Sequence, residues 1–384
     1  MTMFAHTRVA LGLLVLVGMA ALTGCHPGVP DTVKIGVAQP LSGPLKDLGQ
    51  DMVNGAQMAI DDINNTEGGL KIDGKVVKLE MVTADDKADA KAGEAAAHSL
   101  VEAGVVAVIG HLNSGVSIAA APIYAEKMIP QLAISTKPEY TKLGLPTTLR
   151  LVASDALQSK AMGSIAGSLP GDHVYAVVDD NTPYGKSLAE NAAAQLKGKT
   201  IGVRTSLDDK TTDFKALIPQ LAEKKVDVFV TTLADFQIIA LADQLVAAGL
   251  KNMQIVGSDT IKTEGMLKVN PQIGTIYATS PIIGAGEFTG GKPFLEKFRS
   301  RFKHDPVYAA HYAYDAVHVL AAALKKAKSA DGKKLVPALK TVDALAPVTS
   351  SMRFAEDGEQ RYGSVSVYQL NHGSWFLLTR SDVW

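Results

Sequence analysis

The feature that most constrains the fold is a regular alternation of short apolar runs with longer amphipathic runs. Runs of about six residues, rich in Val and Ile, begin at residues 33–38 and recur along the chain, separated by stretches with the period of a helix. Strands joined through helices form parallel sheets, because each crossover helix returns the chain to the same end of the sheet. The sequence therefore predicts an α/β fold with parallel sheets covered by helices on both faces.

The alternation runs through the chain in two blocks. The first predicts strands at 33–38, 76–83, 105–109 and 130–134 and helices at 48–64, 87–102 and 114–127. After an extended segment at 147–152, the second predicts strands at 173–178, 201–206, 226–231, 253–257 and 274–280 and helices at 184–196, 213–224 and 235–248. Helices at 293–303, 309–326 and 333–345 and short β segments at 352–354 and 364–370 follow. Because single cores stop growing near about 250–300 residues, we expect two doubly wound lobes.

The first 24 residues have the pattern of an export signal. Arg8 precedes an apolar run from Val9 to Leu22, which is shorter than the roughly 20 residues of a membrane span. The run ends in Leu22-Thr23-Gly24-Cys25, which resembles a bacterial lipobox, and Cys25 is the only cysteine. The expectation is a signal peptide at 1–24, a diacylated Cys25 and a tether at 25–31; ordinary signal cleavage beside an incidental cysteine is the alternative. His26 follows the cysteine in place of Asp, which by resemblance indicates outer-membrane delivery in a host that has such a membrane.

Composition and motifs exclude several classes of function. The 38 Lys+Arg and 39 Asp+Glu nearly cancel, which argues against a nucleic-acid partner. Residues 185–187 have the Gly-Lys-Ser ending of a phosphate-binding loop, but Asp180 occupies the position of its first glycine. His311 and His318 are seven residues apart rather than the four of a zinc helix. We expect no catalytic residue, no metal site and no cofactor.

Polar residues that follow the predicted strands are the candidates for ligand binding, because open α/β sheets bind ligands beyond the carboxyl ends of their strands. Ser114 follows one strand as the expected N-cap of a helix, and Thr136 follows the next. Asp259 and Tyr184 follow strands of the second block. Ser114 as a cap without a ligand and Asp259 as a surface acid remain open alternatives. Hydroxyl donors on one lobe and a carboxylate on the other suit an α-amino acid held between closing lobes.

Several short segments give the sequence a family resemblance over nearly all of the mature chain. It resembles the periplasmic leucine/isoleucine/valine-binding proteins, which belong to the type I substrate-binding proteins of ABC importers. The order and spacing of the segments carry the resemblance, and they lie at 33–38, 40–44, 59–64, 85–86, 108–112 and 138–139.

The resemblance assigns roles to particular residues. Ser114 and Thr136 match the family's hydroxyl ligands for the α-carboxylate and amino group, and Ile134 matches a position that contacts these groups through its backbone. Asp259 stands where leucine-type proteins carry a Glu for the ammonium, and Tyr184 matches an aromatic residue of the second lobe. The resemblance therefore implies an amino-acid ligand, branched-chain or related.

The side-chain pocket departs from that pattern. Leu48 replaces an aromatic residue, and residues 234–236 lack the family's tyrosines. Ala88 and Asn113 stand where leucine-type proteins have a disulfide. A small amide or carboxylate as ligand therefore remains an alternative. So does a sensor role for the same fold.

The family architecture implies three crossings between the lobes, expected near Ala153, Ile282 and Val348. The first lobe would comprise 32–153 and 283–348, and the second 154–282 and 349–384. The expected partners are a small-molecule ligand, the permease and ATPase subunits of an importer, and the membrane through the N-terminal lipid alone. The resemblance implies an extracytoplasmic, monomeric lipoprotein.

Overall fold

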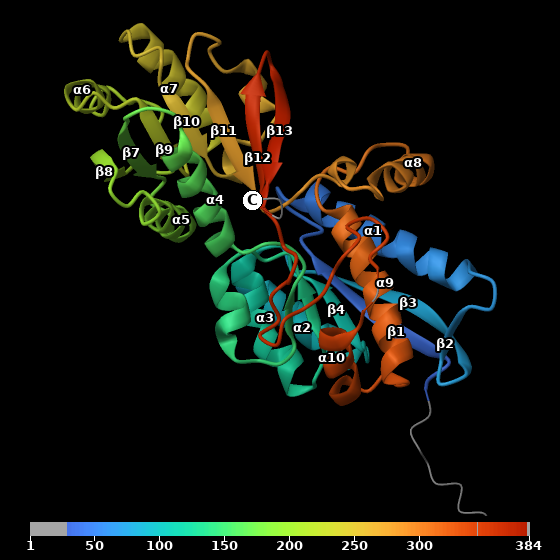
Figure 1. Cartoon of the computed structure of the whole chain (residues 1–384). Helices are drawn as coiled ribbons and strands as arrows, with labels where there is room; N and C mark the ends of the chain where they lie inside the picture. Colours follow the sequence, from blue (N-terminus) through green and yellow to red (C-terminus); the bar gives the residue numbers. More distant parts are fainter. Residues whose placement is uncertain (1–28, 344, 382–384) are drawn as a thin grey trace, which may run out of the picture.

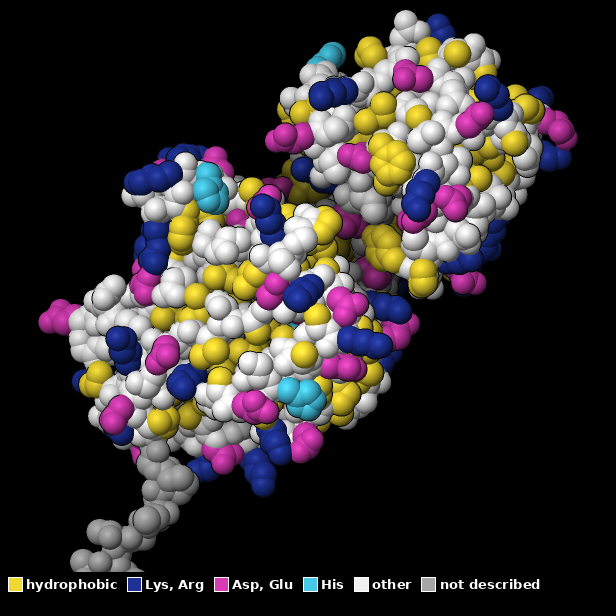
Figure 2. All heavy atoms as spheres, turned by 180° about the vertical axis from the view of Figure 1, so that it is seen from behind, with side chains coloured by type: hydrophobic (Ala, Val, Ile, Leu, Met, Phe, Trp, Pro, Cys, Tyr) yellow, Lys and Arg dark blue, Asp and Glu magenta, His cyan; other side chains and the backbone are white. Residues whose placement is uncertain are grey.

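The computed structural model describes residues 29–343 and 345–381. Two α/β lobes, each built around its own sheet, are joined by crossing segments (Figure 1). A space-filling view shows the lobes as separate bodies that meet at a waist (Figure 2). The expected signal segment at 1–24, Cys25 and the tether up to residue 28 lie outside the described residues.

The first lobe contains a six-stranded sheet in the order β2-β3-β1-β4-β5-β6. All neighbouring strands are parallel except β2 and β3, which form an antiparallel hairpin. Its strands are β1 Thr32–Gln39, β2 Leu70–Ile72, β3 Lys75–Asp85, β4 Ala107–Gly110, β5 Gln131–Ala133 and β6 Thr148–Arg150. Its helices are α1 Lys46–Asn65, α2 Ala90–Glu102, α3 Ser114–Glu126, α8 Gly291–Phe302, α9 Ala310–Ala327 and α10 Gly332–Thr341.

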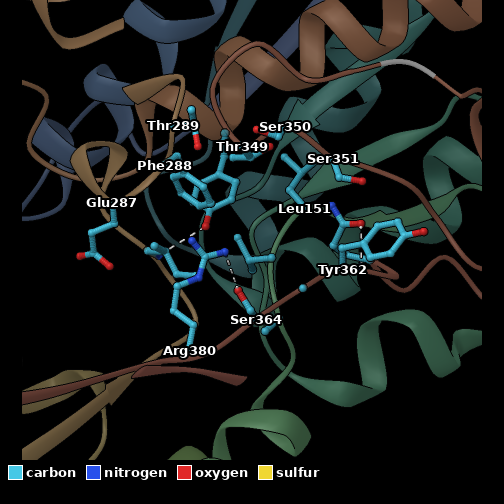
Figure 3. Close-up of a pocket in the computed structure, with 16 residues that line it drawn as sticks. Leu151, Glu287, Phe288, Thr289, Thr349, Ser350, Ser351, Tyr362, Ser364 and Arg380 are labelled. Atoms are coloured by element: carbon cyan, nitrogen blue, oxygen red, sulfur yellow. Dashed lines mark hydrogen bonds between the residues drawn. The ribbon is translucent and has the colours of Figure 1, made fainter. Parts of the chain in front are cut away.

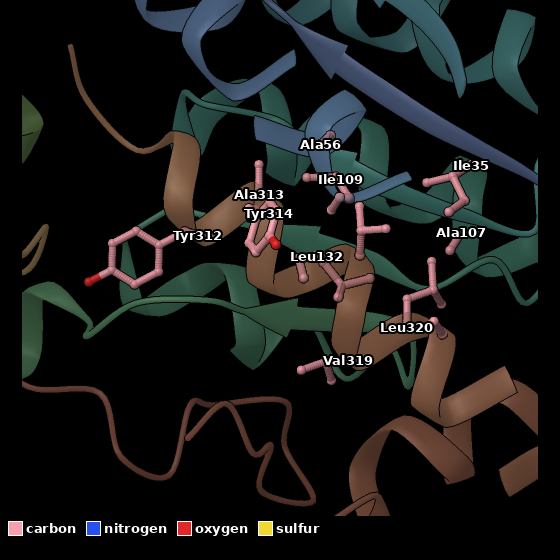
Figure 4. Close-up of a cluster of buried hydrophobic side chains, with 14 of the residues drawn as sticks. Ile35, Ala56, Ala107, Ile109, Leu132, Tyr312, Ala313, Tyr314, Val319 and Leu320 are labelled. Atoms are coloured by element: carbon pink, nitrogen blue, oxygen red, sulfur yellow. The ribbon is translucent and has the colours of Figure 1, made fainter. Parts of the chain in front are cut away.

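Helix α9, although it follows most of the second lobe in the sequence, packs against this sheet. Ile109, Leu132 and Leu320 belong to one buried cluster, which combines side chains from the sheet, α1 and α9 (Figure 4). Gly55 of α1 permits the close approach of α9, because a Cβ there would lie 2.0 Å from the carbonyl oxygen of Ala310. A segment more than 200 residues after β1 thus completes the core of the first lobe.

The second lobe contains a seven-stranded sheet in the order β13-β12-β11-β10-β9-β7-β8, parallel except for β11-β12-β13. Its strands are β7 Val174–Asp179, β8 Thr200–Ser206, β9 Val228–Thr231, β10 Gln254–Gly257, β11 Ile276–Ser280, β12 Ser366–Asn371 and β13 Ser374–Arg380. Its helices are α4 Asp155–Ser168, α5 Pro183–Ala193, α6 Ile218–Glu223 and α7 Asp235–Ala247. The prediction of two doubly wound α/β lobes is confirmed.

Helix α4 and strands β2 and β13 were not predicted from the sequence, and the sequence of each gives only a weak signal. Helix α4 contains Gly163 and Gly167, which weaken a helical pattern. Gly163 is needed for packing, since a Cβ there would lie 2.6 Å from the Ala192 carbonyl oxygen of α5. The β2–β3 hairpin has only a three-residue first strand, although the Asp73-Gly74 turn is a hairpin signal. Strand β13 is exposed along most of its length and so lacks alternation.

We propose that the chain crosses between the lobes at three places. The first lies between β6 and α4, and the second between β11 and α8. Met352 and Phe354 are buried in the core of the first lobe, whereas β12 begins at Ser366 in the second sheet. We therefore propose a third crossing between residues 354 and 366, C-terminal to the position expected near Val348. The expected β segment at 352–354 is reduced to a single bridge between Phe354 and Gln360.

Candidate functional site

The first lobe brings the predicted residues Ser114, Ile134 and Thr136 to one edge of its sheet. Ser114 is the first residue of α3, and Asn113, rather than Ser114 as expected, is the N-cap. The Ser114 hydroxyl accepts a hydrogen bond from the Lys137 backbone N–H at 3.3 Å, which joins the loops that follow β4 and β5. Ile134 is buried and Thr136 is half-buried. Two neighbouring strand ends thus form one polar edge.

A buried arginine fixes the loop that carries Thr136. The Arg150 guanidinium is fully buried and donates to the carbonyl oxygens of Ser135 and, at 3.0 Å, Lys137. It also forms a two-point ion pair with Glu359, both N···O distances being 3.0 Å. Because planar bidentate pairs fix geometry as well as charge, Arg150 positions the backbone on either side of Thr136. Sequence reasoning missed Arg150, whose signal was a charge at the end of an apolar strand.

The second lobe brings together two predicted residues that lie 75 positions apart. The Tyr184 hydroxyl donates to Oδ1 of Asp259 at 2.8 Å, and Gln158 Nε2 donates to the same oxygen at 2.8 Å. Tyr184 is placed by the start of α5, where Thr182 caps the helix through the Gly185 N–H at 3.0 Å. Burial and the neighbouring Asp259 charge raise the pKa of Tyr184 well above its usual value. Tyr184 therefore stays protonated and keeps its hydroxyl as a hydrogen-bond donor to Asp259.

Asp155, the first residue of α4, lies between the two sets of residues and was not predicted. It is 8% exposed, and its backbone N–H donates to the Thr136 carbonyl oxygen at 2.8 Å. Burial raises the pKa of Asp155 to about 6, the Asp259 charge adds to the rise, and the Thr136 hydroxyl partly offsets it. The missed helix α4 thus adds a second carboxyl group to the site.

The two lobes face each other at Asp259. Tyr308, which immediately precedes α9 in the first lobe, has its pKa raised by burial and by the Asp259 charge. The backbone N–H of Tyr308 donates to Oδ2 of the buried Asp51 at 3.0 Å, which fixes this part of the first lobe. A ligand at the edge formed by Ser114 and Thr136 would therefore meet the Asp259 carboxylate across the waist.

A cavity of about 390 Å³ lies at the crossings rather than at the predicted residues (Figure 3). Residues from all three proposed crossings line it, among them Val152, Ile283 and Ser364. Arg380 borders it, donates to the Ser364 hydroxyl at 3.3 Å and lies 5.0 Å from the centre of the Phe288 ring. None of the predicted ligand residues lines this cavity. It is a space between the proposed crossings.

Two kinds of feature are absent from residues 29–343 and 345–381. No group of three or more His, Cys, Asp or Glu side chains in this part of the chain could hold a metal ion. Within the same residues, no helix has both the length and the apolar character needed to cross a membrane.

Comparison with known proteins places this geometry in a family. Residues 32–374 match the periplasmic binding protein family. A Leu/Ile/Val-binding protein homolog of Brucella melitensis is 30% identical over 93% of this chain and 95% of its own. The chain therefore belongs to the periplasmic binding protein family, whose members are non-enzymatic transport components with an extracytoplasmic location.

Solved structures agree with this assignment. A substrate-binding protein of Desulfitobacterium hafniense in complex with Leu superimposes with a TM-score of 0.75 at 25% identity, over 90% of this chain and 100% of that chain. A solute-binding protein of Rhodopseudomonas palustris in complex with 3,4-dihydroxybenzoic acid has a TM-score of 0.71 at 19% identity, covering 91% of this chain and 97% of its own, and shows the shared fold alone. The chain is a substrate-binding protein of the ABC-transporter type.

Proposed function

We propose that this protein captures an α-amino acid, branched-chain or related, between its two lobes and delivers it to the permease and ATPase subunits of an importer. One observation carries the proposal. Asp155 is influenced both by the Thr136 hydroxyl of the first lobe and by the charge of Asp259, the carboxylate to which Tyr184 and Gln158 donate. The Leu-bound structural relative and the Leu/Ile/Val-binding homologs support the ligand class.

The first lobe would bind the α-carboxylate. Ser114 begins a 13-residue helix, α3, so its hydroxyl lies beside backbone N–H groups that have no partner within the helix. The partial positive charge of that helix end favours an anion. Thr136 adds a second hydroxyl on a loop that Arg150 holds, and Ile134 offers its backbone carbonyl oxygen to the amino group.

The second lobe would bind the ammonium group. Asp259 remains only partly buried, and its Oδ1 already accepts from Tyr184 and Gln158. Those two donors fix the carboxylate before the ligand arrives, which lowers the ordering cost of binding. The charge-assisted bond forms when the lobes close and exclude water.

The membrane attachment is part of the proposal. Cys25 would carry the lipid and leave the two lobes outside the cytoplasm as a tethered monomer. Labelling with a radioactive fatty acid checks it: the wild type should incorporate label, and Cys25→Ser should not. Incorporation by Cys25→Ser would contradict the assignment of Cys25.

One relative favours a second candidate ligand class, aromatic or other small carboxylates without an amino group. The Rhodopseudomonas palustris protein with this fold is complexed with such an acid. The Asp259 carboxylate argues against this alternative, because a ligand without an amino group has no positive charge to pair with it. A sensor role would use the same site and differ only in the partner that reads the closed form.

A thermal-shift screen on residues 26–384, unfolded and refolded to remove carried-over solute, tests the ligand class. The screen uses the twenty amino acids, small amides and short carboxylates. A solute at about 100 times its Kd adds roughly 2.7 kcal/mol to the stability of the native state. We expect stabilisation by one group of amino acids, reduced in Ser114→Ala and Asp259→Ala. Unchanged affinity in both variants, or stabilisation by amine-free carboxylates alone, would contradict the proposed site.

A further inference from the structure

A pair of fully buried polar side chains lies behind the hydroxyl-bearing edge of the first lobe. Asp86 follows β3 and His111 follows β4, and neither side chain has any exposed surface. His111 Nδ1 and Oδ2 of Asp86 are 2.7 Å apart, at the short end of the range for an N–H···O hydrogen bond. Apolar residues of similar volume often give equal stability at such positions. Stability alone therefore does not explain the pair.

Both side chains are also held from a second direction. Oδ1 of Asp86 accepts a hydrogen bond from the Ala88 backbone N–H at 2.9 Å, which fixes the carboxyl group in the loop after β3. His111 Nε2 lies 3.2 Å from the Tyr124 hydroxyl of α3. Burial raises the pKa of Tyr124 above its usual value, so this hydroxyl stays protonated. Each ring nitrogen of His111 thus has one partner, and the imidazole is held in one orientation.

The backbone of His111 leads from this pair to the proposed ligand residues. Its N–H donates to the Ser117 hydroxyl, and that hydroxyl donates to its carbonyl oxygen, both at 3.2 Å. The Ser135 hydroxyl donates to the same Ser117 oxygen at 2.5 Å, which joins the loop after β4 to the loop after β5. Ser114 lies three residues after His111, and Thr136 directly follows Ser135. The positions of both proposed ligand hydroxyls therefore depend on where His111 lies.

We propose that Asp86 and His111 act together as positioning residues for the carboxylate end of the captured solute. This inference rests on the proposed function and makes it more specific. The two buried side chains make no contact with the solute. They hold the loop after β4, and through it Ser114 and Thr136, in the geometry that a carboxylate requires. Loss of the pair should therefore weaken binding of the carboxylate and leave the contribution of the second lobe unchanged.

Replacement of the ligand's carboxylate by a carboxamide tests this role. Titration calorimetry on residues 26–384 would compare L-leucine with L-leucinamide, and other amino acids that bind with their amides, at about pH 6, where the amino groups are protonated. In the wild type we expect each amino acid to bind at least about a hundredfold more tightly than its amide. In Asp86→Leu we expect that preference to fall about tenfold, with the affinity for the amide nearly unchanged.

Two more variants separate positioning from packing. Asp86→Asn should keep the wild-type preference within about threefold. Its amide oxygen can accept from Ala88 while its N–H donates to Nδ1 of the other imidazole tautomer, whose Nε2–H then donates to Tyr124. Asp86→Leu combined with His111→Leu should lose no more preference than Asp86→Leu alone, because the two side chains act as a unit. A further loss in the double variant would mean two independent defects and no positioning pair.

The second lobe offers a matched control. His173 Nδ1 lies 2.8 Å from Oδ2 of Asp227, whose Oδ1 also accepts a backbone N–H at 2.9 Å, from Val174. This pair lies at the start of β7 and β9, whereas Asp259 follows the end of the parallel strand β10. Asp227→Leu should therefore keep the wild-type preference. Melting curves check that the variants fold.

A milder variant keeps the test decisive if Asp86→Leu does not fold. Tyr124→Phe removes only the hydroxyl beside His111 Nε2, and the preference for the carboxylate should fall about threefold.

The outcomes separate this inference from the proposed function. If amino acids bind but Asp86→Leu and Tyr124→Phe keep the full preference, or if amino acid and amide lose affinity equally, the positioning role is overturned and the capture of amino acids stands. Equal losses in Asp86→Leu and Asp227→Leu, or in Asp86→Leu and Asp86→Asn, would also overturn it. If the wild type binds no amino acid, the proposed function fails and the positioning role fails with it.

Discussion

The two lobes carry opposite chemistry at the proposed site, and their site residues are held in place in different ways. The first lobe offers hydroxyl and backbone groups on loops that the buried Arg150 holds in place. The second offers the Asp259 carboxylate, fixed by direct hydrogen bonds from Tyr184 and Gln158. A ligand with one anionic and one cationic end would therefore bind in a single orientation. The first lobe therefore depends on a buried residue behind the site, and the second depends on direct hydrogen bonds to Asp259.

The largest expected effect comes from removing the support in the first lobe. Arg150→Ala would leave two backbone carbonyl oxygens and Glu359 without their partner, at a cost of about 3–5 kcal/mol in the free energy of unfolding. Urea unfolding measures it. The exposed pair of Arg353 and Asp343 is the control, because Arg353→Ala should cost less than about 1 kcal/mol. Equal effects of the two substitutions would show that Arg150 does not support the loop.

The second effect concerns affinity rather than stability. Asp259→Ala should weaken amino-acid binding about a hundredfold, since it removes a charge-assisted bond worth about 2–3 kcal/mol. Ser114→Ala should weaken it about fivefold to tenfold, because a neutral hydroxyl contributes about 1 kcal/mol. Titration calorimetry measures both. A larger loss in Ser114→Ala than in Asp259→Ala would reverse the assignment of roles to the two lobes.

The third effect is a pH dependence of the ligand-free protein. The pKa of Asp155 rises from 3.8 to about 6 on folding, so the folded state binds this proton more tightly than the unfolded state does. The resulting stabilisation is complete below about pH 4, is lost as the pH rises to about 6, and is absent at pH 7. The size is roughly 2–3 kcal/mol at about 1.4 kcal/mol per pKa unit.

Asp155→Asn should remove this part of the pH dependence. The variant should therefore be more stable than the wild type at pH 7. Asp315, whose pKa burial also raises to about 6, should retain its own contribution in the variant. Thermal melts from pH 4 to pH 8 measure both curves, and parallel curves for wild type and variant would contradict the assignment.

The smallest effect should come from Tyr184→Phe. It removes one of the two donors that hold Oδ1 of Asp259 but leaves the Gln158 bond at 2.8 Å. We expect amino-acid affinity to fall about threefold to tenfold, in keeping with roughly 1 kcal/mol for a hydrogen bond. A loss as large as that of Asp259→Ala would mean that the tyrosine hydroxyl contacts the ligand directly.

Local sequence patterns predict the fold class, which the structure confirms, and they also supply four residues of the candidate site. The alternation of apolar and amphipathic runs predicts two doubly wound lobes, because burial on both faces of a parallel sheet imposes that pattern. Ser114, Thr136, Tyr184 and Asp259 could be proposed because they lie in or just after the loops that follow predicted strands, and strand ends of a parallel sheet meet at one edge. Signals of this kind are local, so they can be read from a few neighbouring residues.

The tertiary structure decided what depends on distant contacts. Arg150 pairs with Glu359, which is 209 residues away in the sequence. A single charged residue at the end of a strand does not reveal such a distant partner. Asp155 could not be identified from the sequence because it begins α4, a helix that was not predicted. The close approach of α5 requires a glycine at position 163, and that glycine weakens the helical pattern. The raised pKa of Asp155 and its unpaired oxygen arise from burial between lobes, and burial is a property of the assembled molecule.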